Sequence, residues 1–343
     1  MKIKLVDISN IEKYDLEKMY KIYDEWPKIA LNSFDSNQEP INFDNVKHIV
    51  FAGMGGSGSI GDIFSSILSK SNIHVNVVKG YLLPTTVNSE TLVIVISVSG
   101  NTEESLSIIE SAYKKKCRII GFSSGGKLLE FCQKNKIQHR MVNRYHSPRA
   151  SFTSYLYTIL KVLHSSLNII QEDIFESIKE LEKTGQKINS LNLNKDNPAL
   201  NLANWIEDIP IIYYPFGLEA VAIRFKSVLQ ENTKSHTIIE DIVESSHNGI
   251  MAWEKPNRIQ PILLRGKSDS GKTKQRFDLF SEYFQKNNIE CKQVISIEGS
   301  IISKIVNLIY FLDYASIYLA VRRKINPTPV NSITFIKSKL SGG

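Results

Sequence analysis

Residues 51–62 read FAGMGGSGSIGD, a glycine-rich turn that directly follows a β-rich run. A turn of this kind between a strand and a helix places backbone N–H groups and the positive end of a helix where an anion can bind. Strands and helices alternate in this half of the chain, at 48–52, 74–78, 92–96 and 118–122 for the strands and at 62–69 and 103–113 for the helices. Near-continuous apolar strands in such alternation predict a parallel sheet that helices cover on both faces.

The alternation restarts after a helix-rich stretch, 151–188, and a polar segment, 189–197, whose Asn, Lys and Asp content suits a connection between domains. The second pattern has strands at 209–214, 261–264 and 293–297 and helices at 218–230, 272–286 and 300–323. Residues 8–35 have apolar positions at helical spacing, so helices are expected before the first sheet. We therefore predict an α/β protein of two doubly wound parallel-sheet domains with N-terminal helices, divided into residues 1–170, a connection at 171–200, and residues 201–343.

Charge and composition exclude several classes of protein. The 42 Lys and Arg residues exceed the 35 Asp and Glu residues, which gives a net charge of +7 with no long like-charged run. Nucleic acid is therefore not the expected partner, whereas an anionic metabolite is compatible with this charge. The apolar stretch 301–321 contains Lys304, Asn307 and Asp313, so it predicts a buried helix and no membrane span.

The three cysteines, Cys117, Cys132 and Cys291, have neither the spacing of a zinc site nor an even count. Neither a metal site nor a disulfide framework is expected from them, and a reducing compartment suits them best. The first 15 residues lack the apolar run of a signal peptide. These observations predict a cytoplasmic protein.

Gly53, Gly55 and Gly58 satisfy the pattern G-x-G-x-x-G, which is typical of dinucleotide-binding folds. A nicotinamide site usually has an acidic residue at the end of the second strand, about 20 residues farther along the chain. That strand here runs into Lys79 and Gly80 instead. Because the same backbone geometry serves any phosphate, the turn is better interpreted as a general phosphate site.

Three hydroxyl side chains follow the third strand, in the segment SVSGNTEE at residues 97–104. Ser97, Ser99 and Thr102 precede a helix, where their hydroxyls and the turn N–H groups could bind phosphate oxygens. The alternative is an ordinary helix cap, in which Thr102 only terminates the helix. Two hydroxyl-rich turns at one edge of a sheet favour a binding site over two unrelated caps.

The segments GMGGSGSIGD and SVSGNTEE resemble the phosphate-binding segments of the sugar isomerase (SIS) domain, which has a flavodoxin-like fold. Their order in a two-domain chain is similar to the bifunctional phosphoglucose/phosphomannose isomerases, over about residues 45–340. The family commonly has GMGGSAIGGD, so this chain differs around Gly58 and Ser59, while Gly55, Gly56 and Ser57 are unchanged. The resemblance implies that these three residues, with Ser97, Ser99 and Thr102, bind the phosphate of a hexose.

Three further segments resemble catalytic segments of this family. Residues 230–234, QENTK, resemble N-E-N-A-K, whose glutamate is the catalytic base, which implies that role for Glu231. Residues 245–249, SSHNG, resemble E-x-N-H-N, which implies a ring-opening role for His247, although Ser246 replaces the commoner asparagine. Residues 147–152, SPRASF, resemble a P-R-A/S segment, which implies that Arg149 stabilises an enediolate. Taken alone, each of the three would be interpreted as an ordinary surface or structural side chain.

The C-terminal segment 333–340, ITFIKSKL, resembles the I-x-x-L-K ending of the family, whose lysine assists ring opening. Lys337 fits that register better than Lys339. Thr328, between two prolines, is a candidate determinant of whether both C2 epimers are accepted. Doubly wound sheets bind ligands at the carboxyl ends of their strands, so the site is expected there, in the cleft between the two domains. The resemblance further implies a homodimer with a shared active site, and no metal or organic cofactor is expected.

The predicted function is an aldose–ketose isomerase that interconverts glucose 6-phosphate, and mannose 6-phosphate, with fructose 6-phosphate. In this hypothesis Glu231 moves a proton between C2 and C1 through a cis-enediolate, as part of glycolysis and gluconeogenesis. A sugar-phosphate sensor with the same fold and no chemistry is one alternative. A nicotinamide-dependent oxidoreductase is another. Which hexose phosphates are used stays open at this point.

Overall fold

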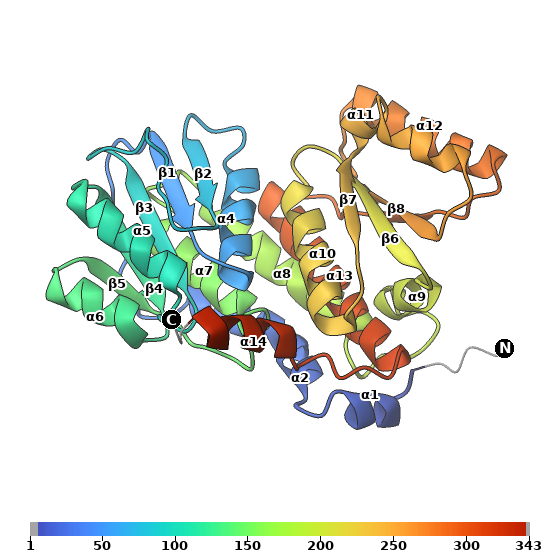
Figure 1. Cartoon of the computed structure of the whole chain (residues 1–343), viewed down its shortest axis with the longest axis horizontal. Helices are drawn as coiled ribbons and strands as arrows, with labels where there is room; N and C mark the ends of the chain where they lie inside the picture. Colours follow the sequence, from blue (N-terminus) through green and yellow to red (C-terminus); the bar gives the residue numbers. More distant parts are fainter. Residues whose placement is uncertain (1–5, 341–343) are drawn as a thin grey trace.

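The computed structural model describes residues 6–340 and contains two α/β halves (Figure 1). The first half is built on five parallel strands in the spatial order β2-β1-β3-β4-β5. These strands are β1 (His48–Ala52), β2 (His74–Val78), β3 (Leu92–Ser97), β4 (Arg118–Ser123) and β5 (Gln138–Met141). Every residue of β3 is buried, as expected for a central strand that is covered on both faces.

Helices cover both faces of this first sheet. They are α4 (Gly56–Ile67), α5 (Glu103–Lys114), α6 (Gly126–Lys134) and α7 (Phe152–Leu163). Ile94 packs on one side with side chains of α4 and α7, whereas its neighbour Val95 packs on the other side with side chains of α5 and α6. This alternation follows from the two-residue period of a strand.

The second half has four parallel strands in the order β7-β6-β8-β9. The strands are β6 (Ile209–Tyr214), β7 (Ile238–Asp241), β8 (Ile259–Arg265) and β9 (Lys292–Ile295). The helices around them are α9 (Pro198–Trp205), α10 (Glu219–Thr233), α11 (Ile242–Ser245), the 3-10 helix η1 (Gly249–Glu254) and α12 (Gly271–Lys286). The side chains of α12 pack with Tyr213 and Leu263 on one face, and α10 packs on the other. The predicted pair of doubly wound parallel sheets is therefore confirmed.

Helices from both ends and the middle of the chain join the two halves. They are α1 (Ile8–Tyr14), α2 (Met19–Asp24), α3 (Trp26–Phe34), α8 (Gln171–Ile188), α13 (Ile301–Arg322) and α14 (Asn331–Leu340). α13 packs against α8, α9 and α10, and one hydrophobic core runs through it from the first sheet to the second. By length and composition α13 could cross a membrane, but 89% of its most apolar window is buried inside the protein. It has the character of a core helix, as the sequence predicts.

The largest departure from the expected secondary structure is the start of α4. The helix begins at Gly56, inside the glycine-rich turn, and not near residue 62. Glycine disfavours helix, yet here it permits close packing, because a β-carbon at Gly61 would lie 2.9 Å from Phe51 and Val77. The sequence patterns also missed β5, whose residues are mostly polar, and β7, which has only four residues. They missed the helices α6 and α9 as well.

Candidate active site

The glycine-rich turn lies at the carboxyl edge of the first sheet. Gly55 precedes α4 with φ +52°, a left-handed conformation that favours glycine. Ser57 follows in the first turn of the helix and is buried. A β-carbon at Gly56 would lie 3.1 Å from the Pro148 carbonyl oxygen, so this turn is in contact with the segment that carries Arg149.

The hydroxyl-rich turn after β3 lies beside the glycine-rich turn, because β1 and β3 are adjacent in the sheet. Ser97 Oγ lies 2.9 Å from Thr102 Oγ1 and accepts a hydrogen bond from the Gly100 N–H. Ser99 Oγ accepts from the Asn101 N–H, and Thr102 is the N-cap residue that directly precedes α5. The structure thus brings the three hydroxyls and residues 55–57 to one sheet edge, between the starts of two helices.

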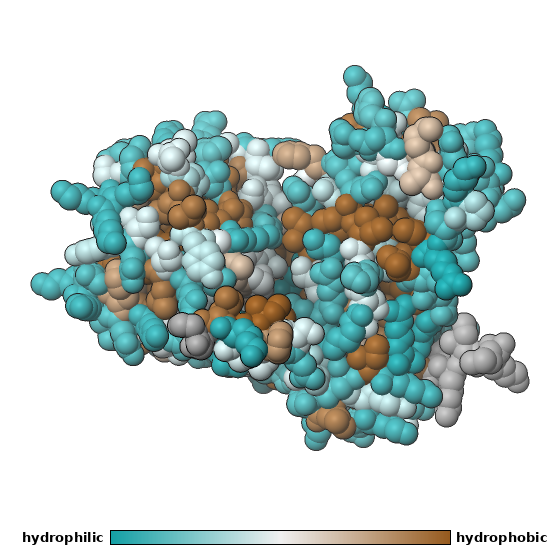
Figure 2. All heavy atoms as spheres, viewed as in Figure 1, coloured by the Kyte–Doolittle hydropathy of each residue, from teal (hydrophilic) through white to brown (hydrophobic). Residues whose placement is uncertain are grey.

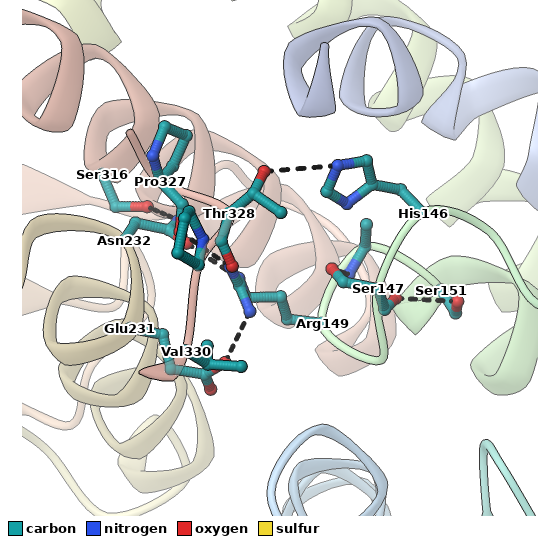
Figure 3. A network of polar contacts seen from close by, with 12 residues as sticks. His146, Ser147, Arg149, Ser151, Glu231, Asn232, Ser316, Pro327, Thr328 and Val330 are labelled. Atoms are coloured by element: carbon teal, nitrogen blue, oxygen red, sulfur yellow. Dashed lines mark hydrogen bonds and ion pairs between the residues drawn. The ribbon is translucent and has the colours of Figure 1, made fainter. Parts of the chain in front are cut away.

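Arg149 is buried where the two halves meet, and its guanidinium binds four different groups (Figure 3). Nε donates to Asn232 Oδ1 at 2.8 Å, and Nη1 donates to Glu231 Oε2 at 2.8 Å. Nη2 donates to the carbonyl oxygens of Pro327 at 2.8 Å and Thr328 at 3.1 Å. One arginine therefore holds the end of α10 and the chain before α14 in a fixed arrangement.

Glu231 keeps contact with solvent while it pairs with Arg149. Its side chain is 25% exposed, whereas that of Arg149 is 4% exposed. The carboxylate lies in the wall of an open pocket of about 700 Å³. That pocket is lined by Gly55, Ser227, Gln230, Glu231, Lys234, Ser235, His236 and residues 329–333. The candidate base and the glycine-rich turn thus face the same space.

A second buried arginine, Arg224, holds the backbone of Arg149 in place. Arg224 lies on α10, seven residues before Glu231. It pairs with Asp313 of α13 at 2.6 Å, and both side chains are almost fully buried. Arg224 Nη2 also donates to the Arg149 carbonyl oxygen at 2.8 Å. Tyr23 from α2 donates its hydroxyl to Asp313 at 3.2 Å. The Arg149 carbonyl oxygen is therefore held by Arg224. Asp313 and Tyr23, from two other parts of the chain, fix Arg224 in turn.

Asp313→Asn is expected to lower the free energy of unfolding by about 3–5 kcal/mol, because it leaves the buried charge of Arg224 without its partner. Urea unfolding of the purified protein measures this change. The matched control is the double variant Arg224→Met with Asp313→Leu, which removes both charges and should recover most of the loss. A single variant as stable as the unchanged protein would contradict the role given to this ion pair.

Thr328 and Lys234 shape the segment that closes the pocket. Thr328 Oγ1 lies 3.3 Å from His146 Nε2, and burial together with the nearby Arg149 cation lowers the pKa of His146. Lys234 Nζ donates to the carbonyl oxygens of Pro329, at 2.7 Å, and Glu231. Burial, and then the charge of Arg149, lowers the pKa of Lys234. The Lys234 contacts tie residues 327–329 to the end of α10, and the Thr328 contact ties them to the segment before α7.

His247 does not lie beside Glu231 in this chain. α10 connects the parallel strands β6 and β7, so it runs opposite to them, and Glu231 lies at the end of α10. His247 follows β7 and α11, at the carboxyl edge of the second sheet (Figure 1). The 15 residues of α10 span about 22 Å between these two ends. Glu231 therefore lies toward the amino edge of the second sheet, whereas residues 55–57 and 97–102 lie at the carboxyl edge of the first sheet.

Lys337 and Lys339 both lie on α14, whose side chains are exposed throughout. The pocket reaches the start of this helix, at Asn331, Ser332 and Ile333, and neither lysine contributes to its lining. Figure 2 shows hydrophobic side chains on α14 in this view, and Ile333, Phe335 and Ile336 are at least 41% exposed. An exposed apolar helix of this kind is typical of a surface that another chain covers.

Several residues of the site were given no role by the sequence patterns. Asn232 directly follows Glu231, and His146 lies three residues before Arg149, so nearness in sequence to a predicted residue was the signal for both. Asp313 was noted only as a polar residue in an apolar stretch, where a buried partner is the natural explanation. Within residues 6–340, no group of three or more His, Cys, Asp or Glu side chains is placed to hold a metal ion.

Comparisons with known proteins agree with this architecture. Residues 42–165 match the SIS domain, and residues 195–340 match the bacterial phospho-glucose isomerase C-terminal SIS domain. Two solved structures share the fold at low identity. A tagatose-6-phosphate ketose/aldose isomerase from Escherichia coli has a TM-score of 0.65 and 17% identity, covering 95% of this chain and 97% of its own. The C-terminal domain of a glucosamine-fructose-6-phosphate aminotransferase from Francisella tularensis has a TM-score of 0.69 and 16% identity, covering 91% and 97%.

Relatives at higher identity match almost the whole chain. A bifunctional phosphoglucose/phosphomannose isomerase from Caldicellulosiruptor bescii is 32% identical over 336 residues, which is 95% of this chain and 96% of that protein. Another from Aquifex aeolicus is 29% identical over 334 residues, covering 95% and 99%. The match includes both sheets and the helices that join them. The chain therefore belongs to the family of bifunctional phosphoglucose/phosphomannose isomerases.

Proposed function

We propose that this sugar-phosphate isomerase interconverts glucose 6-phosphate and mannose 6-phosphate with fructose 6-phosphate through a cis-enediolate. The observation that supports this most directly is the Glu231 carboxylate, which is partly exposed, paired with Arg149 and in the same pocket as Gly55. The relatives from Caldicellulosiruptor bescii and Aquifex aeolicus are both named phosphoglucose/phosphomannose isomerases. A positioned carboxylate beside a fixed cation is what proton transfer next to a carbonyl requires.

In the proposed mechanism Glu231 takes the proton from one of C1 and C2 and returns it to the other. The negative charge that develops on the substrate oxygens is stabilised by Arg149. The bonds of Arg149 to the described residues use four of its five N–H groups, one of them on Nη1. The other Nη1 N–H, beside the Glu231 carboxylate, is the donor that we assign to a substrate oxygen.

The phosphate is proposed to bind at the edge of the first sheet. Gly55, Gly56 and Ser57 lie at the start of α4, while Ser97, Ser99 and Thr102 precede α5, so two helix N-termini and four hydroxyls lie at one sheet edge. A dianionic phosphate bound there would place the opposite end of a hexose toward the pocket of Glu231. The binding energy of the phosphate would then fix the reacting carbons against the base.

His247 is proposed to act in the site of a second copy of the chain. Its place at the far end of α10 from Glu231 excludes direct cooperation with Glu231 in the arrangement described here, whereas a homodimer can bring it to the other copy. The exposed apolar side chains of α14 suit burial in such an assembly. Lys337 lies on the same helix and is kept as the proposed ring-opening lysine, with Thr328 as the proposed determinant of epimer choice.

The function is tested by incubating the protein with fructose 6-phosphate in deuterated water and separating the sugar phosphates. We expect glucose 6-phosphate and mannose 6-phosphate that carry deuterium at C2, because the proton on Glu231 exchanges with solvent. Proton NMR of the separated products measures the label. Products without deuterium would contradict the enediolate route, since an internal hydride shift incorporates none. Saturable binding of the sugar phosphate without any product would instead support a sensor.

A further inference from the structure

The second sheet lacks one strand that the first sheet has. In the first half, β4 is followed by α6 and then β5, which pairs with β4 as the outermost strand. In the second half, β9 occupies the position of β4, but the chain passes from Ile295 directly to α13, which begins at Ile301. Within residues 6–340, no strand pairs with the outer edge of β9. This half is therefore left with a vacant position at the edge of its sheet.

A pocket of about 410 Å³ lies at this vacant position, between β9 and the helices α8, α9 and α13. Its floor is apolar and includes Ile188, Leu202, Val294 and Leu308, all at most 7% exposed. The volume is within the range of about 300–1,000 Å³ that is usual for small-molecule sites, and an apolar lining is typical of them. None of the residues proposed to bind the sugar phosphate lines this pocket.

Two polar side chains interrupt the apolar floor at one place. Asn307 of α13 donates a hydrogen bond from Nδ2 to Thr184 Oγ1 of α8, and both residues are at most 9% exposed. Thr184 Oγ1 in turn donates to the Glu180 carbonyl oxygen at 2.8 Å. Apolar surroundings with a few fixed polar groups are the usual composition of a site that orients its ligand.

Three lysines surround the pocket. Lys183 and Lys187 come from α8, and Lys292 comes from β9. Lys183 is paired with Glu180, which also lines the pocket. Lys187 and Lys292 have no carboxylate within ion-pair distance among residues 6–340. The rim therefore has an uncompensated positive charge above an apolar floor, which favours an anion with an apolar body.

We propose that this pocket is a second ligand site, for a small organic anion that joins an aromatic or acyl body to a carboxylate, sulfonate or phosphate group. The body would contact Val294 and Leu308, and the anionic group would lie between Lys187 and Lys292. A hexose phosphate fits poorly, because its hydroxyls would lose their hydrogen bonds to water against the apolar floor. The site does not depend on the proposed isomerase function.

The test is a fluorescence titration of the full-length protein with anilinonaphthalene sulfonate, a dye whose emission rises in apolar surroundings. One saturable site per chain is expected, with weaker binding of the uncharged analogue N-phenylnaphthylamine. The variant Lys187→Glu with Lys292→Glu is expected to weaken dye binding about tenfold or more, because two attractive charges become repulsive ones. Its isomerase activity on fructose 6-phosphate should match that of the unchanged protein, which reports that the fold is intact.

The matched control is Lys114→Glu with Lys116→Glu. These two lysines line an open groove beside β4 and β5 in the first half. The control changes the net charge by the same amount as the test variant, because it also replaces two lysines by glutamates. We expect dye affinity to be unchanged in the control. Equal weakening in both double variants, the same affinity for the charged and uncharged dyes, or no saturable site in the intact protein would each overturn the proposal. The last result is also expected if a second copy of the chain covers the pocket.

Discussion

Replacing Glu231 by glutamine is expected to lower kcat for isomerisation of fructose 6-phosphate about a thousandfold, within the usual range for loss of a general base. Glutamine keeps the shape of the side chain, and its carbonyl oxygen can still accept the hydrogen bond from Arg149 Nη1. The neighbouring network should therefore persist, and the affinity for the sugar phosphate should change little. Steady-state kinetics gives kcat, and a ligand titration of the inactive variant gives the affinity.

The control for this variant is Glu219→Gln, at the first turn of the same helix. Glu219 is exposed and lies at the opposite end of α10 from Glu231, so the identical substitution there should leave kcat unchanged. A Glu231→Gln variant that retains near-normal turnover would overturn the assignment of the base. A variant that loses both turnover and ligand affinity would show a binding role in place of proton transfer.

A mixture of two inactive variants, Glu231→Gln and His247→Ala, is expected to regain about a quarter of the normal activity when the two chains are co-expressed. If each site takes Glu231 from one chain and His247 from the other, a heterodimer has one site with both defects and one intact site. Random pairing makes about half of the dimers mixed, and each of these has half of the normal activity. Isomerase assays on the separate variants and on the co-expressed sample measure the gain.

Two affinity tags allow the heterodimer to be isolated, and its activity should then rise to about half of the normal value. In the matched control both chains carry Glu231→Gln, each with a different tag. This dimer should stay inactive. If the mixed dimer is no more active than its parents, His247 does not complete the site of a partner chain. That result would leave the role of Glu231 intact, because the Glu231→Gln variant tests it separately.

The sheets could be predicted because their strands are short apolar runs with glycines or hydroxyls at their ends. The strand β3 is the clearest case, since LVIVIS is buried at every position. The strand β5 could not be found in this way, because Gln138, His139 and Arg140 occupy an edge where polar side chains remain partly in water. The early start of α4 could not be predicted, because glycine has a low helix propensity. In the structure, close packing of these glycines against β1 and β2 outweighs that propensity.

The composition of the site was partly predictable, and its geometry was not. The loops around residues 55 and 97 converge because neighbouring parallel strands end at one edge, which the order of strands implies. The pairing of Arg149 with Glu231 joins residues 82 positions apart in different halves, and no local pattern encodes such a contact. The roles of Glu231, His247 and Lys337 came from the family resemblance and remain predictions.

The packing of α2 and α3 against α13 affects how the protein folds during its synthesis. Tyr310 donates its hydroxyl to the Tyr23 carbonyl oxygen, across 287 positions of sequence, and stacks on Trp26 with ring centroids 5.4 Å apart. α3 also packs against α7 and α8, but the burial of Tyr23 and Trp26 is complete only when α13, far along the chain, packs beside them. Contacts of such long sequence separation slow folding, because a large loop must close before they form. We expect part of this aromatic surface to stay exposed on the nascent chain until α13 has been synthesised and covers it.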